Sequence, residues 1–278
     1  EGYPQIPNPT GEGLAEQAYA LRVGADDITL CAHTPAGLAY GARTLAQMAA
    51  GKKVVPGLAI NDWPALRYRG IQQDVSRGQV PHLDTLKRLA DVAAEAKLNV
   101  LEPYIEHVYK FRAHPDSSPP EGYTPEEMRE LFDHGAARGV EVHPLFQVLG
   151  HSYHILKLPK YQHLRVGPCE KAPWIMTFDI RKPEAVDFVL EMVDELCETM
   201  PGTIFPVDIT EIDIDGLYAS GTTEEQVTDL VFNYVLKLNE AVQRHGMRLL
   251  IAQGPLDSTG HLAGMGPKLD KLPKEVII

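Results

Sequence analysis

Four acidic residues lie within residues 208–215, directly after an apolar run that begins at Phe205. They are Asp208, Glu211, Asp213 and Asp215. Burial in apolar surroundings raises the pKa of a carboxyl group, and a raised pKa is what a general acid needs near neutral pH. A second carboxylate nearby can act as a nucleophile, a base or an electrostatic stabiliser. The segment is therefore the first candidate for acid–base catalysis; a loop of solvated acids and a Ca²⁺-binding loop are the alternatives.

A second candidate is the sequence Asp74-Val75-Ser76-Arg77. A guanidinium group offers five donors in a fixed geometry, which is enough to hold two sugar hydroxyls at once. The alternative is an ion pair between Asp74 and Arg77 that serves only the structure. We expect Arg77 to bind substrate.

Two further groups of polar and aromatic residues follow predicted strands. Tyr104, Glu106 and His107 end one strand, and Gln147 and His151 follow another. Aromatic rings beside acids are typical of a sugar-binding subsite, although aromatic rings at strand ends also serve as packing. For His151 the alternative is a hydrogen-bonded core histidine. We treat all five as candidate substrate-binding residues.

The sequence contains no motif that predicts a metal ion or a cofactor. His143, His151 and His154 do not place ligands on one face of a helix, so we expect no metal site. No Gly-x-Gly-x-x-Gly or Gly-x-x-x-x-Gly-Lys-Ser/Thr motif follows a strand, which counts against nucleotide binding. No Gly-x-Ser-x-Gly motif occurs, which counts against a serine hydrolase.

From residue 69 onward, strand patterns alternate with helix patterns, as in a parallel α/β sheet. The pattern predicts strands over 70–76, 99–106, 140–148, 204–210 and 249–252, a sixth strand from 275, and helices over 83–97, 124–138, 183–200 and 224–245. An open doubly wound sheet and a (β/α)8 TIM-type barrel both fit. Candidate side chains that follow strands favour the barrel, whose sites lie at the carboxyl ends of its strands. A barrel of this type needs eight strands. The pattern predicts only about six in this chain, so we expect an incomplete barrel.

The first part of the chain has a different pattern. Residues 19–23 and 28–32 predict a hairpin, and Thr34 with Pro35 predicts the start of a helix that ends at Gly51. We therefore divide the chain into a small α+β domain over residues 1–62 and the barrel over residues 63–278.

The composition restricts the class of partner. The chain has 278 residues, 26 Lys and Arg, and 38 Asp and Glu, for a formal net charge of -12. Nucleic acids and anionic membranes both favour a basic surface, so neither is expected as a partner. No apolar run reaches the roughly 18 residues that a membrane-spanning helix needs, so we expect no membrane insertion. A neutral ligand such as a sugar remains compatible; the oligomeric state is not predicted.

With these residues placed, the sequence resembles the family 20 glycoside hydrolases, the β-N-acetylhexosaminidases, over nearly its whole length. Residues 17–50 are similar to the small domain that precedes their barrel. The most specific match is to the start of the barrel. The matching residues there and beyond are Trp63-Pro64, Arg69-Gly70-Ile71, Asp74-Val75-Ser76-Arg77, Lys97-Leu98-Asn99, Arg138-Gly139-Val140 and Gly150-His151-Ser152.

The resemblance implies roles for individual residues. Arg77 corresponds to an arginine that binds hydroxyls of the non-reducing N-acetyl sugar, and His151 to a histidine that supports the acidic site. Glu211 corresponds to the general acid. The aspartate that precedes this acid in the family, and polarises the 2-acetamido group of the substrate, is Thr210 here. Asp208 or Asp213 is the expected replacement, and Asp213 is also a candidate substrate-binding residue.

Three functions are compatible with this pattern. The first is a retaining, substrate-assisted hydrolase that removes terminal β-linked N-acetylhexosamine, GlcNAc or GalNAc, from oligosaccharides or glycoconjugates. The second is a glycosidase of altered specificity with an ordinary carboxylate pair. The third is a non-catalytic carbohydrate-binding protein. We expect a carbohydrate as partner and no cofactor; since similar enzymes are often exported and the chain begins with Glu1, a periplasmic or secreted location is favoured over a cytoplasmic one.

Overall fold

The structure is a computed structural model that describes residues 3–167, 173–218, 221–251 and 266–278. The chain forms two compact units. The first comprises Glu1–Ile71, Arg88–Leu101 and Gly135–Glu141, and the second comprises Gln72–Lys87, Glu102–His134 and Val142–Ile278.

Alternating apolar residues near the N-terminus form a three-stranded antiparallel sheet. Its strands are β1 (Tyr19–Val23), β2 (Ile28–Ala32) and β3 (Leu58–Asp62), in the order β2-β1-β3. Leu21 of the central strand pairs with Leu30 on one side and with Ile60 on the other. The predicted hairpin of β1 and β2 is thus confirmed, whereas β3 was not predicted.

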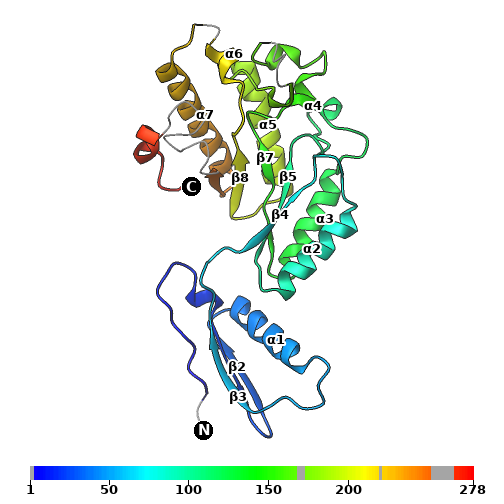
Figure 1. The fold of residues 1–278 in the computed structure, drawn as a ribbon, viewed down its shortest axis with the longest axis vertical. Coiled ribbons are helices and arrows are strands. Elements are labelled where there is room, and N and C mark those ends of the chain that lie inside the picture. The colour runs from blue at the N-terminus through cyan, green and yellow to red at the C-terminus, as the bar shows by residue number, and fades with distance from the viewer. Residues whose placement is uncertain (1–2, 168–172, 219–220, 252–265) are drawn as a thin grey trace. The chain divides into compact units, whose positions relative to one another are not determined.

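Helix α1 (Pro35–Ala49) packs on this sheet (Figure 1). As predicted, Thr34 caps the helix, and its side chain accepts a hydrogen bond from Gly37 N at 3.4 Å. Gly37 is needed where α1 approaches the sheet, because a Cβ atom there would lie 2.4 Å from Ala18 O. The small α+β fold therefore rests on a capped helix in close contact with a short sheet.

The second sheet provides the strands that carry the candidate residues. Its order is β4-β5-β7-β8-β9, with β6 paired to β5, and the pairs β5–β7, β7–β8 and β8–β9 are parallel. The strands are β4 (Gly70–Asp74), β5 (Val100–Ile105), β6 (Glu141–Val142), β7 (Leu145–Gln147), β8 (Ile204–Asp208) and β9 (Arg248–Ile251). The single strand predicted over 140–148 is divided in two at His143 and Pro144, since proline lacks the N–H that a continuous ladder would need.

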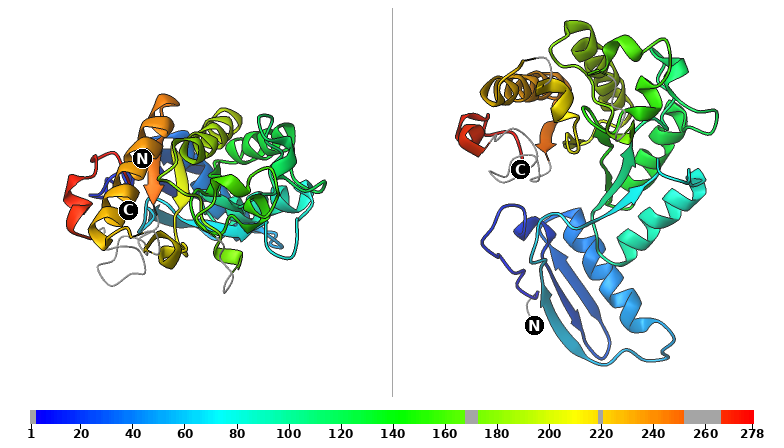
Figure 2. Two further views of the ribbon diagram at one scale, coloured as in Figure 1. Left: turned by 90° about the horizontal axis from the view of Figure 1, so that it is seen from above. Right: turned by 45° about the horizontal axis from the view of Figure 1, so that its top comes forward.

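A helix follows most strands and returns toward the start of the next, an alternation that Figures 1 and 2 display. The helices are α2 (Leu83–Glu95), α3 (Pro125–Ala136), α4 (Tyr153–Leu156), α5 (Pro183–Thr199), α6 (Ile214–Tyr218) and α7 (Glu224–Arg244), with 3-10 turns at Ala15–Gln17, Pro115–Ser117, Gln162–Leu164, Pro173–Ile175 and Gly266–Lys271. The four helices predicted after residue 69 are confirmed, each with its ends within three residues. This is the α/β fold of a (β/α)-barrel region preceded by a small α+β module.

The C-terminal segment meets the sheet at one point. Ile277 forms an isolated parallel bridge with Leu250 of β9, with Ile277 N donating to Leu249 O at 2.8 Å. The sixth strand predicted from residue 275 is therefore present as a single bridge.

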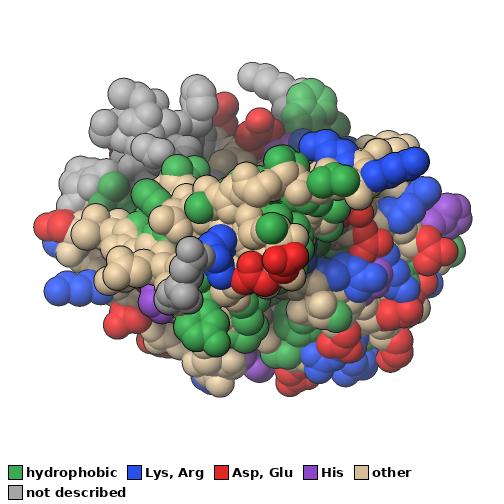
Figure 3. All heavy atoms as spheres, turned by 90° about the horizontal axis from the view of Figure 1, so that it is seen from below, with side chains coloured by type: hydrophobic (Ala, Val, Ile, Leu, Met, Phe, Trp, Pro, Cys, Tyr) green, Lys and Arg blue, Asp and Glu red, His purple; other side chains and the backbone are tan. Residues whose placement is uncertain are grey.

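On the face displayed in Figure 3, acidic and basic side chains lie intermixed. Among the described residues, no helix combines the length and apolar character that crossing a membrane requires.

A buried ion pair holds the segment that leads into α5, and it supports a stability prediction. Asp179 is 3% exposed and accepts hydrogen bonds from Arg181 Nε at 2.7 Å and Nη2 at 2.9 Å. Burial acts to raise the pKa of Asp179, but the donors of Arg181 outweigh it and hold that pKa below its ordinary value.

Asp179→Asn is expected to lower the free energy of unfolding at pH 7 by about 2 kcal/mol, because hydrogen bonds to a charged acceptor are lost. Since the folded pKa is lowered, this contribution is present above the unfolded value of about 3.9 and is lost as the pH falls through the folded pKa. Urea unfolding of both proteins at pH 7 and near pH 3 checks this. An equal difference at the two pH values would contradict the ionic origin.

Candidate functional site

The candidate residues follow four strands of the parallel sheet. Arg77 follows β4, Glu106 follows β5, His151 follows β7 and Glu211 follows β8. The carboxyl ends of neighbouring parallel strands lie at the same edge of a sheet, so these side chains can converge. All four belong to the second compact unit.

Tyr104 is the centre of a buried hydrogen-bond network. Its hydroxyl accepts from Arg77 Nη2 at 2.7 Å and from Gln147 Nε2 at 2.8 Å, and donates to Glu106 Oε1 at 3.0 Å. Arg77 Nε also donates to Glu106 Oε1, at 3.0 Å. Burial raises the pKa of Tyr104, and the charge of Glu106 raises it further, so the phenol stays protonated. The network fixes Arg77 while 52% of its side chain stays exposed.

The backbone near Arg77 is held as firmly as its side chain. Asp74 Oδ1 accepts hydrogen bonds from the backbone N–H groups of Ser76 at 2.9 Å and Arg77 at 3.1 Å. Ser76 Oγ in turn accepts from Glu106 N at 2.9 Å. The loops after β4 and β5 are therefore joined. Asp74 holds the backbone of the Arg77 loop, and its Oδ2 atom also lies 3.6 Å from Arg77 Nε, so the ion pair considered as the alternative is present.

His151 connects two carboxylates. Its Nε2 atom contacts Glu211 Oε2, and its Nδ1 atom lies 3.8 Å from Glu106 Oε1. Glu106 is buried at 7% side-chain exposure, whereas 62% of the Glu211 side chain is exposed. Glu211 can therefore reach a bound ligand while its inner oxygen stays with the imidazole.

Both partners in this contact have unusual backbone angles. His151 has φ of 51° and Glu211 has φ of 49°, in the left-handed region that favours glycine. Residues held in this region tend to cluster at functional sites, where the surrounding structure maintains the strain. The strained pair therefore marks the ends of β7 and β8 as a site, independently of the charges.

Gly150 allows the loops that carry this pair to pack together. A Cβ atom on Gly150 would lie 2.4 Å from Thr210 O and 2.5 Å from Glu211 O. Both are backbone atoms, which cannot move aside as the end of a flexible side chain can. The segment Gly150-His151 thus packs directly on Thr210-Glu211.

Gly150→Ala is expected to separate these loops and to lower the free energy of unfolding by about 2 kcal/mol through overpacking. Gly167→Ala is the matched control, because nothing lies within 4 Å of the Cβ position there. Denaturant unfolding monitored by circular dichroism measures both variants. Equal stability of the two variants would show that the contact is not tight.

Asp208 and Thr210 lie beside this network, and neither shares a described hydrogen bond with it. Asp208 is half-buried, pairs in register with Gln147, and accepts a hydrogen bond from Thr210 N at 2.8 Å through Oδ1. Its charge also contributes to the raised pKa of Tyr104, after burial and Glu106. Asp208 therefore adds negative charge to the end of β8.

Asp213 has a local structural partner. It is 8% exposed, and its Oδ1 atom accepts a hydrogen bond from Gly216 N at 3.0 Å at the start of α6. Its backbone N–H donates to Thr177 Oγ1 at 2.7 Å. Helix capping accounts for these contacts, so a role of Asp213 in substrate binding stays a prediction.

A cavity of about 280 Å³ lies over the network. Its lining consists of Arg77, Glu106, His151, Tyr153, His154 and Trp174. Three of these were predicted as site residues, but Tyr153, His154 and Trp174 were not. Trp174 is 58% exposed and lies in the 3-10 turn Pro173–Ile175. It was not predicted as a site residue because it follows no predicted strand.

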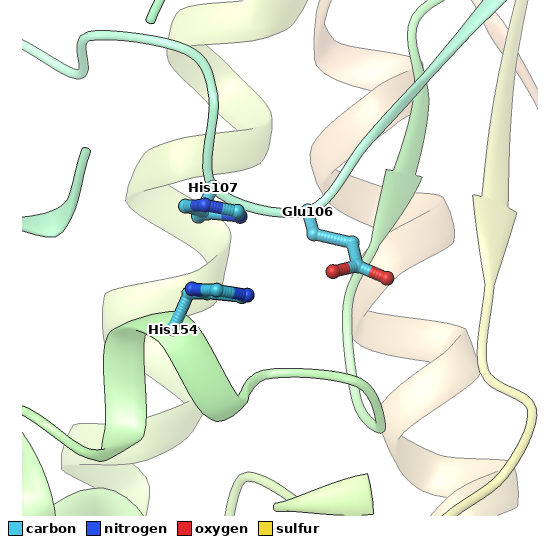
Figure 4. A group of neighbouring side chains, drawn as sticks. All are labelled: Glu106, His107 and His154. Atoms are coloured by element: carbon cyan, nitrogen blue, oxygen red, sulfur yellow. The ribbon is translucent and has the colours of Figure 1, made fainter. Parts of the chain in front are cut away.

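His107 lies next to this cavity and packs on one of its walls. Its ring stacks on that of His154, with centroids 3.8 Å apart and an interplanar angle of 4° (Figure 4). Burial lowers the pKa of His107 to about 4, helped by the charges of His154 and Lys157. Burial also lowers the pKa of His154. Both rings are therefore neutral near pH 7.

Chemically, the cavity offers a fixed guanidinium group and two aromatic rings, and its lining residue His151 contacts the exposed carboxylate of Glu211. The guanidinium group can donate to ligand hydroxyls, and the aromatic faces can pack against the apolar face of a ring. The carboxyl group of Glu211, in contact with an imidazole, can transfer a proton. The arrangement suits a neutral, hydroxyl-rich ligand.

Comparisons with known proteins agree with this chemistry. Residues 5–63 match the model of glycosyl hydrolase family 20, domain 2, and residues 66–252 match that of the glycosyl hydrolase family 20 catalytic domain. A β-hexosaminidase of Porphyromonas gingivalis is 25% identical, over 85% of this chain and 35% of that protein. A β-N-acetylhexosaminidase of Cellulomonas fimi is 32% identical, over 49% of this chain and 31% of that protein. The chain thus spans about a third of the length of these relatives.

Solved structures share the fold. The chitobiase of Flavobacterium johnsoniae has a TM-score of 0.75 at 24% identity, over 87% of this chain and 40% of that one. The exo-β-N-acetylglucosaminidase of Vibrio harveyi, solved in complex with N-acetylglucosamine, has a TM-score of 0.75 at 19% identity, over 95% of this chain and 46% of that one. Because the two family models together match most of residues 5–252, the chain belongs to glycosyl hydrolase family 20.

Proposed function

We propose that the protein hydrolyses terminal β-linked N-acetylhexosamine residues of oligosaccharides or glycoconjugates. The observation that carries the proposal is Glu211, an exposed carboxylate at the end of β8 that contacts His151 beside a cavity lined by Arg77. Family membership and the names of the relatives support the same activity.

In this proposal Glu211 is the general acid and base. It protonates the glycosidic oxygen as the bond to C1 breaks, while the carbonyl oxygen of the substrate's 2-acetamido group forms a bond to C1. Water then attacks C1 as the bond from C1 to the acetamido oxygen breaks, and Glu211 accepts the proton of the water. The two successive inversions at C1 leave the product in the β configuration. His151 holds one oxygen of Glu211, and Arg77 donates to hydroxyls of the terminal sugar.

The negative charge that polarises the acetamido group must come from a residue other than Thr210. Thr210 provides a hydroxyl group, which cannot balance the positive charge of the cyclised intermediate. We assign this charge to Asp208 rather than to Asp213, because Asp213 is engaged in capping α6. Asp208 has a backbone donor on one oxygen and adds its charge next to Tyr104.

Thr210 also favours a second candidate function. Without the family's aspartate, the site could act on a β-glycoside that lacks the acetamido group, with Glu211 and a second carboxylate as an ordinary pair. The two functions differ in the substituent at C2 of the sugar, so they predict different substrates.

Nitrophenyl β-glycosides separate these functions. We expect release of nitrophenol from the β-N-acetylglucosaminide or the β-N-acetylgalactosaminide, and at least about 100-fold lower kcat/KM for the β-glucoside and β-galactoside. The reverse preference would support the second function. Binding of sugars by calorimetry without turnover of any aryl glycoside would overturn both.

Trp174 is expected to bind the substrate rather than take part in the chemistry. Trp174→Ala should raise KM by about tenfold, or ~1.4 kcal/mol, and leave kcat within about twofold, because a stacking surface is lost. Trp63→Ala is the control, since Trp63 is also exposed but does not line this cavity. Steady-state kinetics with an aryl N-acetylglucosaminide checks this. Equal effects of the two substitutions would remove Trp174 from the site.

A further inference from the structure

Three potential metal ligands come together at the wall of the cavity. Glu106 and His107 follow β5, and His154 lies in α4. One ligand atom from each residue lies within 4.8 Å of the others, among the residues that the structure describes. Figure 4 shows the two imidazole rings face to face, with the carboxylate of Glu106 beside them.

His107 has a buried nitrogen without a partner. The side chain is 8% exposed, and its Nδ1 atom is fully buried and makes no hydrogen bond within the described part of the chain. Its stacking on His154 brings the ring faces together and so provides no hydrogen bond between them. Buried polar atoms in folded proteins are nearly always satisfied, so this nitrogen indicates a missing partner.

Glu106 and His154 each have a potential ligand atom that takes part in no described hydrogen bond. Arg77 and Tyr104 both donate to Oε1 of Glu106, and His151 also approaches this oxygen, so Oε2 has no described hydrogen bond. In His154, Lys157 Nζ lies 3.5 Å from Nδ1, which leaves Nε2 to act as a ligand. Oε2 of Glu106 and Nε2 of His154 can therefore bind an ion while the hydrogen bonds described above are kept. Because a metal ion lies in the plane of each imidazole ring that binds it, the two rings would tilt out of their parallel stack on binding.

We propose that Glu106, His107 and His154 form a binding site for one divalent transition-metal ion of the Zn²⁺ class. Two imidazole nitrogens and one carboxylate oxygen are ligands that Zn²⁺ commonly takes, with water or a further ligand in an open fourth position. Zn–N distances of about 2.1 Å would draw the three atoms closer together than 4.8 Å. The proposal does not depend on the hydrolase activity.

The pattern of the sequence could not show this site. We expected no metal ion because His143, His151 and His154 do not place ligands on one face of a helix. The proposed set instead combines two neighbouring residues after β5 with a histidine of helix α4, and only the fold brings them together.

Calorimetric titration of chelator-treated protein with Zn²⁺ tests the proposal. We expect one ion per chain for the wild type, and an affinity at least about 100-fold lower in His154→Ala and in His107→Ala, a larger loss than outer-shell changes usually cause. His163→Ala is the control, because His163 is exposed and outside the cluster. Circular dichroism identifies variants that are not folded, and His154→Gln replaces any variant that fails.

Substitution with Co²⁺ gives a second measurement that is independent of activity. We expect visible absorption bands of a nitrogen- and oxygen-ligated ion, without the near-ultraviolet band of a thiolate ligand, and their loss in His154→Ala. Undetectable Zn²⁺ binding by the wild type, the same affinity in the cluster variants as in His163→Ala, or a thiolate band would overturn the proposal.

Discussion

Replacing Glu211 with Gln is expected to lower kcat/KM for a nitrophenyl β-N-acetylglucosaminide by about 10²–10⁴-fold, the usual contribution of a general acid or base. The amide keeps the size of the side chain and can remain next to His151, but it cannot release a proton to the glycosidic oxygen. Steady-state kinetics on the two proteins measures the effect.

The leaving group provides the internal control for Glu211→Gln. A dinitrophenyl glycoside leaves without protonation, so cleavage of its bond to C1 should be much less impaired than that of a poorer leaving group. Asp215→Asn is the matched variant, because Asp215 is an exposed acid in the same segment and, unlike Glu211, makes no described contact with His151. Full activity of Glu211→Gln on poor leaving groups would place the general acid elsewhere.

Arg77→Lys is expected to have the second largest effect, a fall in kcat/KM of about 100-fold. The guanidinium group now bonds to both Glu106 and Tyr104 and still has an exposed edge for ligand hydroxyls. A lysine ammonium group cannot keep this planar arrangement of donors, so both the network and the sugar contacts weaken.

Arg112→Lys is the control for Arg77→Lys, since Arg112 is an exposed arginine outside the cavity. Kinetic parameters for the aryl N-acetylglucosaminide, together with a thermal unfolding curve, separate lost recognition from lost folding. Wild-type kcat and KM in a folded Arg77→Lys protein would remove Arg77 from the binding site.

Local patterns were enough to predict most of the fold. The strong periodicity of the long helices and the apolar strands led to the correct α/β class, and Thr34 correctly marked the start of α1. The split between β6 and β7 was missed, although Pro144 lies inside the predicted strand. β3 was missed because its partner β1 lies far away in sequence and its own alternation is short.

The site was predictable as separate motifs but not as a network. Glu211, His151, Glu106 and Arg77 were each singled out from residue type and position after a strand. Their contacts depend on two left-handed backbone angles and on the close approach at Gly150, which no spacing rule encodes.

Residues outside regular elements were harder to predict. Trp174 reaches the cavity from a short 3-10 turn, and the contact between His107 and His154 joins the loop after β5 to helix α4, which are distant in sequence. Asp213, by contrast, was proposed from an acidic cluster, although its described contacts are those of a helix cap.

Inhibition by a thiazoline analogue of the cyclised N-acetylglucosamine intermediate is the most direct test of the proposed substrate-assisted mechanism. The analogue resembles the bicyclic species that forms only if the substrate's own acetamido group attacks C1. If Glu211 and Asp208 support that attack, the thiazoline should inhibit hydrolysis of the N-acetylglucosaminide competitively, with a Ki at least about 100-fold below KM. Unimpaired hydrolysis at saturating thiazoline would contradict it.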